Sequence, residues 1–221
     1  MNILQEWNWL KYWLRIKLGG IKDPRGKLTG LLSYDEGLTL VKLAAMIPEG
    51  GAIVEIGCYG GLSTAYLLEG AKRTAGAIYS IDPFDTDIGS QKKDLTNIRL
   101  ADRKPSREQV LRDLAGFGSG RFELIAGYSY EAVKEWKLPI DLLWIDGNHD
   151  YQAVRQDYQQ WERFIKSGGL IAFHDSNKQD GAEGWTKYGW DGPTRLVREV
   201  MKPPHWKNIT RVDSITYAQK A

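Results

Sequence analysis

The sequence predicts an α/β domain built on a doubly wound, mostly parallel sheet of seven strands. Apolar runs of strand length alternate five times with segments of helical periodicity. Such alternation is typical of parallel strands joined by crossover helices. The run at 140–146 is apolar almost throughout, as expected for a strand buried on both faces. Two strand-like pieces near the end of the chain, at 206–212 and 214–220, complete the expected sheet.

The other elements follow from their local patterns. The remaining strands are short apolar runs, at 52–57, 76–82, 121–127 and 169–175. The expected helices lie at 62–72, 105–118, 129–136, 151–166 and 193–201. The longest expected helix has an apolar stripe at steps of three and four, made by Tyr151, Val154, Tyr158, Trp161 and Ile165.

Length and composition indicate one soluble globular domain. The 221 residues suffice for a full hydrophobic core, with 42% apolar and 26% charged side chains. A net charge of +2 gives no support for nucleic-acid binding. Cys58 is the only cysteine, which excludes a disulfide within the chain, so we expect a reducing, cytoplasmic location. The sequence shows neither a signal-peptide pattern nor an apolar stretch near the ~18–20 residues of a membrane span.

Residues 1–30 differ in composition from the rest, and we treat them as a Trp-rich, basic helical segment that precedes a domain at 31–221. They contain six basic and two acidic side chains, with three tryptophans among the basic ones. A basic helix rich in tryptophan is typical of a membrane-surface contact. The same helix also fits packing on the domain or on a second subunit. Residues 1–18 are therefore expected to contact a membrane surface or to support a homo-oligomer.

Polar residues and glycine follow four of the expected strands. In an open parallel sheet, ligands bind beyond the carboxyl ends of the strands, so these residues should line one edge of the sheet. The first strand delivers Glu55 and Gly57, the second Asp82, the fourth Asp146, and the fifth His174 and Asp175.

The turn after the first strand reads EIGCYGGLS, at 55–63. A glycine there lets the backbone approach a ligand closely. The dinucleotide pattern G-x-G-x-x-G, counted from Gly57, fails at Tyr59 and Leu62. The turn instead resembles motif I of class I S-adenosylmethionine-dependent methyltransferases, which implies their Rossmann-like fold and S-adenosyl-L-methionine as cofactor. A tight turn with a solvated acid is the alternative. By the resemblance, the cofactor contacts in this turn are Glu55, Gly57, Cys58, Tyr59, Gly60 and Ser63.

Two further segments are expected beside the same cofactor. Asp82 ends the second strand, where the methyltransferase and dinucleotide-binding folds both place an acid for the ribose hydroxyls. In the methyltransferases that this chain resembles, a G-x-S segment after the third strand approaches the adenine, which implies Gly127, Tyr128 and Ser129. Ser129 also fits the position of a simple helix N-cap, and both roles stay open.

The most specific resemblance lies at the fourth and fifth strands. WIDGNHDYQAV at 144–154 and GGLIAFHDS at 168–176 resemble the metal-dependent O-methyltransferase branch of the class I fold. Within it, the resemblance is closest to the macrocin and mycinamicin O-methyltransferases and the cephalosporin-hydroxylase-like proteins, and it covers residues 30–200.

This resemblance implies a divalent metal held by Asp146, His174 and Asp175, with Asp146 also beside the cofactor and His149 as general base. The chemistry agrees, because a divalent cation lowers the pKa of a hydroxyl that it touches and a nearby imidazole can take the proton. The relatives carry a carboxylate where this chain has His174, and imidazole suits iron or zinc better than magnesium. Mg²⁺ is the ion expected from the family. Mn²⁺, Fe²⁺ and a metal-free pair of histidines stay open.

The aromatic residues divide into two groups. Trp136, Trp144 and Trp161 are expected in the core. Those in GWTKYGWDGP, at 184–193, follow the fifth strand on a Gly-rich stretch. They are placed either to stack on a sugar ring or cover the site, or simply to pack within the loop.

The sequence thus favours an S-adenosylmethionine-dependent O-methyltransferase that acts on a hydroxyl of a sugar, a glycan or a glycosylated natural product. Its expected partner is a small-molecule or glycan acceptor. The first alternative is an oxygenase like the cephalosporin-hydroxylase-like proteins, with His149, His174 and a carboxylate as iron ligands. The second is a binding protein that keeps the cofactor site without catalysis.

Overall fold

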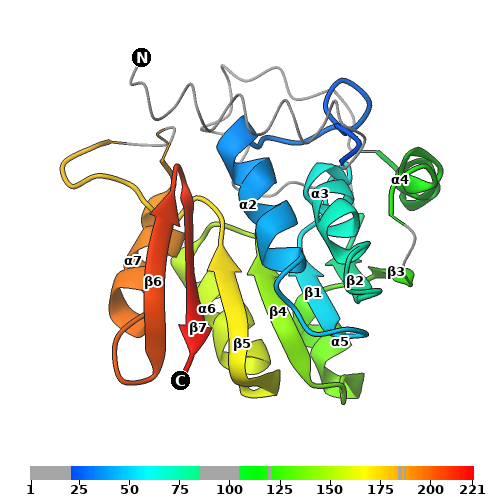
Figure 1. The fold of residues 1–221 in the computed structure, drawn as a ribbon. Helices are drawn as coiled ribbons and strands as arrows, with labels where there is room; N and C mark the ends of the chain where they lie inside the picture. Colours follow the sequence, from blue (N-terminus) through cyan, green and yellow to red (C-terminus); the bar gives the residue numbers. More distant parts are fainter. Residues whose placement is uncertain (1–20, 85–104, 119–120, 184–185, 187) are drawn as a thin grey trace, which may run out of the picture.

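A computed structural model describes residues 21–84, 105–118, 121–183, 186 and 188–221. The segment expected to contact a partner (1–18) lies outside these residues. So does Trp185. The described chain forms a seven-stranded sheet of order β3-β2-β1-β4-β5-β7-β6. Strand β7 runs opposite to the other six, so it pairs antiparallel with β5 and β6, and all other pairs are parallel (Figure 1). The predicted fold class is confirmed. The strands are β1 (Ala52–Ile56), β2 (Ala77–Asp82), β3 (Phe122–Ala126), β4 (Ile140–Ile145), β5 (Ile165–Phe173), β6 (Trp206–Val212) and β7 (Ile215–Lys220).

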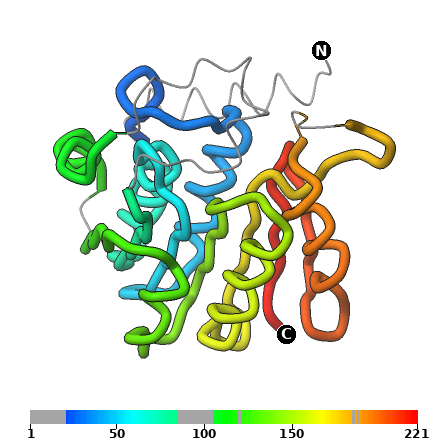
Figure 2. Tube along the Cα trace, turned by 180° about the vertical axis from the view of Figure 1, so that it is seen from behind, coloured from blue at the N-terminus to red at the C-terminus, as the bar shows by residue number. Residues whose placement is uncertain are grey.

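Helices cover both faces of the sheet. Helices α2 and α3 lie together on one face, and α5, α6 and α7 lie on the other, as the two opposite views show (Figures 1 and 2). Their bounds are α2 (Tyr34–Ala44), α3 (Leu62–Ala71), α4 (Arg107–Leu114), α5 (Ser129–Glu135), α6 (Tyr151–Trp161) and α7 (Asp191–Val200). Helix α2 is absent from the sequence prediction, although Ser33 and Glu36 form a capping box at its start.

The sheet separates two hydrophobic cores. Side chains along a strand alternate between its two faces. In β4, Leu142 and Trp144 therefore join the core beneath α2 and α3, whereas Leu143 and Ile145 join the core beneath α6 and α7. All six residues of β4 are buried, which explains the nearly continuous apolar run. The three tryptophans predicted for the core are confirmed, with Trp144 and Trp161 fully buried and Trp136 packed against the core only in part.

The strand order reverses direction between β1 and β4, since the chain continues to β2 and β3 on one side and to β5 on the other. Such a switch point leaves a crevice at the carboxyl ends of the strands. At this edge, backbone hydrogen bonds continue one residue beyond the strands: Asp146 N donates to Ile56 O at 2.8 Å, and His174 N donates to Ile145 O at 3.0 Å. The segments that carry the predicted site residues are thus anchored to the sheet.

Several boundaries differ from the sequence prediction. Helix α4 spans Arg107–Leu114 instead of 105–118, and the other large difference lies between α6 and β5. The helix expected at 151–166 ends at Trp161, and Ile165 already belongs to β5 after a short 3₁₀ turn at Glu162–Phe164. The periodicity places Ile165 in the helix because it falls four residues after Trp161, on the helical apolar stripe. Helix α7 begins at Asp191 rather than 193.

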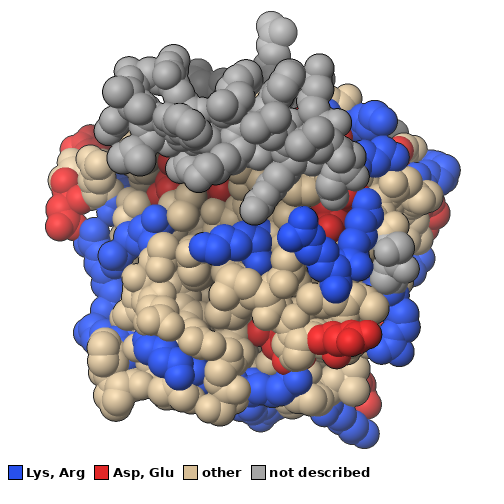
Figure 3. All heavy atoms as spheres, viewed as in Figure 1, with Lys and Arg blue, Asp and Glu red and all other residues tan. Residues whose placement is uncertain are grey.

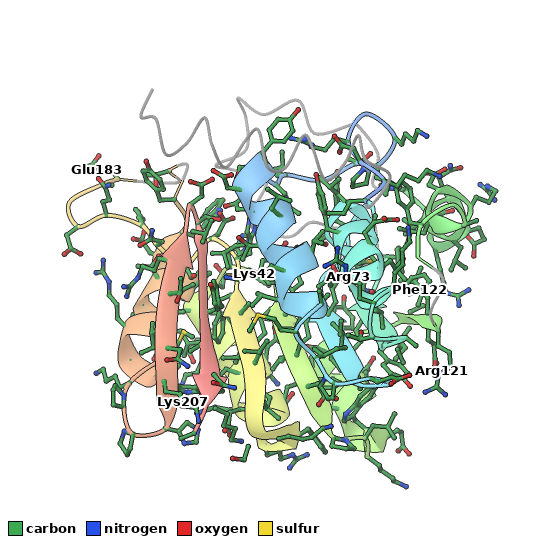
Figure 4. All side chains as sticks on the ribbon, viewed as in Figure 1. Lys42, Arg73, Arg121, Phe122, Glu183 and Lys207 are labelled. Carbon is green, nitrogen blue, oxygen red and sulfur yellow. The ribbon has the colours of Figure 1, made fainter. Side chains whose placement is uncertain are left out.

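The carboxyl edge lies at the top of Figure 1. In the same orientation, Glu183 lies near this edge, whereas Lys207 and Arg121 lie toward the opposite one (Figure 4). Lysine and arginine side chains occupy several separate places on the face seen in Figure 3. Within the part of the chain that the structure describes, every helix is too short or too polar to cross a membrane.

Candidate active site

The glycine turn after β1 lies directly against the segment that follows β4. Gly57 has φ +86°, a conformation that side-chain-bearing residues rarely adopt. A Cβ at this position would come within 2.2 Å of the carbonyl oxygen of Asp146 and 2.9 Å of Cα of Gly147. Only glycine therefore allows the first turn to meet the Asp146 segment.

Asp82 holds this turn from the end of β2. Its Oδ2 accepts hydrogen bonds from the backbone N–H groups of Cys58 (3.1 Å) and Tyr59 (2.9 Å), and its Oδ1 accepts from Phe84 N (2.9 Å). The residue is 4% exposed. Asp82 thus shapes the turn, and its contact with the ribose of a cofactor stays a prediction.

Glu55 lies beneath the turn, fully buried. Its carboxylate accepts hydrogen bonds from three hydroxyls, those of Ser63, Thr64 and Ser80. Burial raises the pKa of Glu55 to about 7, although the three hydroxyls act in the opposite direction. In this position Glu55 fastens the start of α3 to β1 and β2. Contact with a cofactor stays a prediction for this residue and for Gly60 and Ser63.

The segment after β3 is joined to α6. Gly127 N donates to Asp82 O at 3.0 Å, which places the Gly127–Ser129 segment beside the end of β2. The N-cap of α5 is Tyr128, so the N-cap role considered for Ser129 is wrong. Ser129 is instead the first residue of the helix, and its hydroxyl donates to the Asp157 carboxylate. Burial raises the pKa of Asp157 to about 6, a shift that the Ser129 hydrogen bond reduces.

Four ionisable side chains meet where β4 and β5 end. Nδ1 of His174 lies 2.9 Å from Oδ1 of Asp146 and 3.7 Å from Oδ2 of Asp175. Nε2 of His149 lies 3.5 Å from the same Asp146 oxygen and 3.6 Å from the same Asp175 oxygen. Two imidazole nitrogens and two carboxylate oxygens thus face one another. The four residues are those that the sequence predicts as metal ligands and general base.

The charges in this cluster are strongly coupled. Burial alone would raise the pKa of Asp146, but His174 and then His149 outweigh it and hold that pKa below its usual range. Burial alone would lower the pKa of His174, but Asp146, Asp175 and Glu36 raise it well above its usual value. Burial raises the pKa of Asp175, and the two histidines offset this only in part.

The ligand atoms of Asp146, His149 and His174 all lie within 4.8 Å of one another, close enough to bind one metal ion. Carboxylate oxygens suit Mg²⁺ and Mn²⁺, whereas imidazole nitrogens suit Fe²⁺ and Zn²⁺. The donors present fit a divalent cation, and their mixed chemistry favours a transition ion over magnesium.

The chain after β5 folds back onto the cluster. Trp190 N donates to Asp175 O at 2.9 Å, and the Trp190 ring stacks on the His149 ring at 5.6 Å between centroids. A groove of about 740 Å³ lies beside this pair, lined also by Tyr151, by residues 178–182 and by α7 as far as Glu199. The aromatic loop residue Trp190 therefore contacts the candidate base directly.

Sequence reasoning missed Glu36. This residue of α2 is 4% exposed, and its Oε2 lies 3.7 Å from Nε2 of His174. Burial alone would raise the pKa of Glu36, but His174, Ser214 and Ser33 hold it below its usual range. The Ser33-x-x-Glu36 pattern signals a capping box, but nothing local signals the contact with His174.

Comparison with protein families decides the class. A family described as a methyltransferase domain matches residues 54–176, more than half of the chain. The chain belongs to this methyltransferase family. The match includes the glycine turn and all four residues of the Asp146–Asp175 cluster, whereas Glu36 lies outside it. The macrocin-like subgroup that the sequence suggested stays a prediction.

Solved structures share the fold of this methyltransferase. The cofactor-bound protein Rv0187 from MTB is 19% identical, with a TM-score of 0.62 over 96% of this chain and 95% of that one. The SAH-bound Podospora anserina methyltransferase PaMTH1 is 18% identical, with a TM-score of 0.59 over 96% and 87%. An O-methyltransferase from Bacillus cereus in complex with SAH is 17% identical, with a TM-score of 0.56 over 86% and 83%.

Among curated proteins, the uncharacterized protein R132 of Acanthamoeba polyphaga mimivirus is 44% identical over 36 residues. This match spans 16% of each chain and therefore carries no functional conclusion.

Proposed function

We propose that this methyltransferase transfers a methyl group from S-adenosylmethionine to a hydroxyl of a sugar, a glycan or a glycosylated natural product, with the help of a divalent metal. The supporting observation is the contact between the two predicted sites. A Cβ on Gly57 would overlap the carbonyl oxygen of Asp146, so the turn expected to hold the cofactor abuts the predicted metal ligands. Methyl donor and activating cluster would therefore be neighbours.

The cofactor is inferred from several sources. The family is one of methyltransferases, and fold neighbours from Bacillus cereus and Podospora anserina are described as bound to SAH. In this chain, the turn that requires glycine at Gly57 and the Asp82 carboxylate fit close approach of a nucleoside to the backbone.

In the proposed reaction, Asp146, His174 and Asp175 would hold the metal, and His149 would serve as the base rather than as a ligand. A bound divalent cation would lower the pKa of the acceptor hydroxyl. His149 accepts the hydroxyl proton on Nε2, the acceptor oxygen forms a bond to the methyl carbon, and the sulfur keeps the electron pair of the broken S–C bond as S-adenosylhomocysteine is released. Trp190 restrains the His149 ring by stacking on it. The groove beside them offers room for the acceptor.

The first test is calorimetric titration of S-adenosylmethionine into metal-stripped protein, alone and with Mg²⁺, Mn²⁺ or Fe²⁺. We expect cofactor binding and a separate metal-binding event that the Asp146→Ala substitution abolishes. Cofactor binding without any metal event would reject the metal and leave transfer by the histidines alone. Absence of cofactor binding would overturn the whole proposal.

The role of His149 has its own test, once an acceptor is found among glycosides. His149→Ala should reduce methyl transfer by about 10²–10⁴-fold and leave cofactor affinity nearly unchanged. His205→Ala is the matched control, because His205 pairs with Glu162 on the exposed surface at 2.8 Å. Equal losses of transfer and of cofactor affinity in His149→Ala would argue against a role as base.

One observation also favours a second candidate function. Asp146, His149 and His174 make a set of two histidines and one carboxylate with ligand atoms within 4.8 Å. Iron(II) oxygenases use such a set. Oxygen consumption that depends on added Fe²⁺, without methyl transfer, would support this alternative over methyl transfer.

A further inference from the structure

Glu36 reaches the cluster from outside the matched methyltransferase region. It is the third residue of α2, and the family match begins only at residue 54. Helix α2 runs opposite to the parallel strands, so its first turn lies at the carboxyl edge of the sheet (Figure 1). The Glu36 carboxylate is thereby brought to the far side of the His174 ring from Asp146.

The Glu36 carboxylate is held firmly. Its Oε1 accepts hydrogen bonds from Ser214 N (3.0 Å) and Ser214 Oγ (2.5 Å). Its Oε2 accepts from Ser33 N at 2.7 Å and faces Nε2 of His174 at 3.7 Å. Ser214 in turn accepts a hydrogen bond from Asp175 N at 3.3 Å. Glu36 therefore contacts the cluster both directly and through Ser214.

The two nitrogens of His174 have different surroundings. Nδ1 faces the oxygens of Asp146 and Asp175, and Nε2 faces Glu36. When one ring nitrogen of a histidine binds a metal, the hydrogen bond made by the other fixes the tautomer and the ring orientation. A carboxylate is a common partner for that second nitrogen.

We propose that Glu36 is a positioning residue for His174, holding the proton on Nε2 so that Nδ1 is directed at Asp146 and Asp175. The metal-binding part of this inference rests on the proposed function. The site would then combine ligands from the family core with an orienting carboxylate from the preceding helix. Loss of that carboxylate would loosen His174 without removing any ligand.

The test compares Glu36→Gln with Ser33→Ala in the full chain. Glu36→Gln keeps the shape of the side chain and removes its charge. Ser33→Ala removes the hydroxyl that caps the same helix but leaves the backbone contact with Glu36 and the carboxylate itself. Any effect of simply weakening α2 should appear in both variants, and an effect on His174 only in the first.

The readouts are Zn²⁺ affinity by calorimetry and ¹⁵N NMR spectra of protein labelled at its three histidines. In the wild type with Zn²⁺, we expect the metal on Nδ1 of His174 and the proton on Nε2. Glu36→Gln should weaken Zn²⁺ binding about 10–100-fold and disturb the His174 signals. Ser33→Ala should match the wild type in both. Zn²⁺ bound through Nε2, or equal affinity and unchanged His174 signals in Glu36→Gln, would overturn the proposal.

Metal-free spectra separate this inference from the proposed function. If the wild type binds no Zn²⁺ through His174, the metal role fails, but the Nε2 proton of His174 still reports on Glu36. Slow exchange of that proton with solvent in the wild type, and fast exchange in Glu36→Gln, would support positioning by Glu36. Similar exchange in both would reject it.

Discussion

Two acids near the ends of neighbouring parallel strands, Glu55 fully buried and Asp146 partly buried, behave in opposite ways. Glu55 is near the end of β1 and Asp146 directly follows β4, and the two strands pair along their length. Glu55 is hydrogen-bonded by hydroxyls alone, and burial raises its pKa to about 7. Asp146 also loses hydration, but two histidines hold its pKa below its usual range. The histidines beside Asp146 favour its charged form despite the lost hydration, and Glu55 has no such charged partner among its hydrogen bonds.

The difference between their pKa shifts suits the two acids to different roles. A carboxyl that is often protonated near neutral pH can tie hydroxyls together beneath a turn at a small electrostatic cost. A carboxylate kept ionised by imidazoles is suited to bind a cation. Hydroxyl groups thus surround Glu55 beneath the glycine turn, whereas paired charges surround Asp146.

The largest effect is expected at the turn between the two acids. Gly57→Ala should lower the free energy of unfolding by about 3 kcal/mol, since it combines an unfavourable positive φ with overlap of Cβ and the Asp146 carbonyl. Urea unfolding measures this change. Gly50→Ala is the control, because Gly50 has φ +68° and an added Cβ there would meet no atom within 4 Å. Its cost should be about 1 kcal/mol. Similar costs for both variants would show that the contact between the two motifs is unimportant.

The next largest effect is expected when each acid is replaced by its amide, in Asp146→Asn and Glu55→Gln. Asp146→Asn leaves the imidazolium of His174 without its nearest carboxylate, at 2.9 Å. We expect the free energy of unfolding at pH 7 to fall by about 2–3 kcal/mol, the range for a hydrogen bond between charged groups. Glu55→Gln at the same pH should be close to neutral or stabilising. Two losses of equal size would contradict the distinction between the regions.

The raised pKa of Glu55 also predicts that the free energy of unfolding depends on pH. Because its folded pKa is raised from 4.5 to about 7, its contribution is fully present below pH ~4.5 and is lost as the pH rises through about 7. The stability of Glu55→Gln relative to the wild type should therefore rise between these limits, by on the order of 1–3 kcal/mol. Urea unfolding of both proteins from pH 4 to 8 checks this. A constant difference would mean that the pKa of Glu55 is the same in the folded and unfolded states.

The smallest effect concerns Ser129. Its hydrogen bond favours the charged form of Asp157, whose pKa is about 6. Ser129→Ala should therefore cost about 1 kcal/mol above pH 6 and less below it. In an Asp157→Asn background, the cost should be the same at pH 5 and pH 8. A cost independent of pH in the wild-type background would refute the coupling.

The sequence predicted the sheet well because its strands are short apolar runs ended by glycine or an acid. It also predicted that Asp146, His149, His174 and Asp175 meet, since parallel strands deliver their ends to one edge. It misplaced Ile165 because the helical stripe of α6 continues in register into β5. Local periodicity cannot show where packing ends a helix.

The contacts of Glu36 could not be predicted in this way. It lies 178 positions from Ser214, and the two are joined only because α2 packs beside the β6–β7 turn. Likewise, the three hydroxyls around Glu55 come from two other elements, α3 and β2. Pairings of this kind depend on tertiary packing and have no local sequence pattern.

The backbone beyond the strand ends has a consequence for hydrogen exchange. Gly57, Gly127, Asp146 and His174 each donate their amide to the end of a neighbouring strand. These four amides should exchange with solvent at rates set by opening of the central sheet, far more slowly than those of ordinary surface loops.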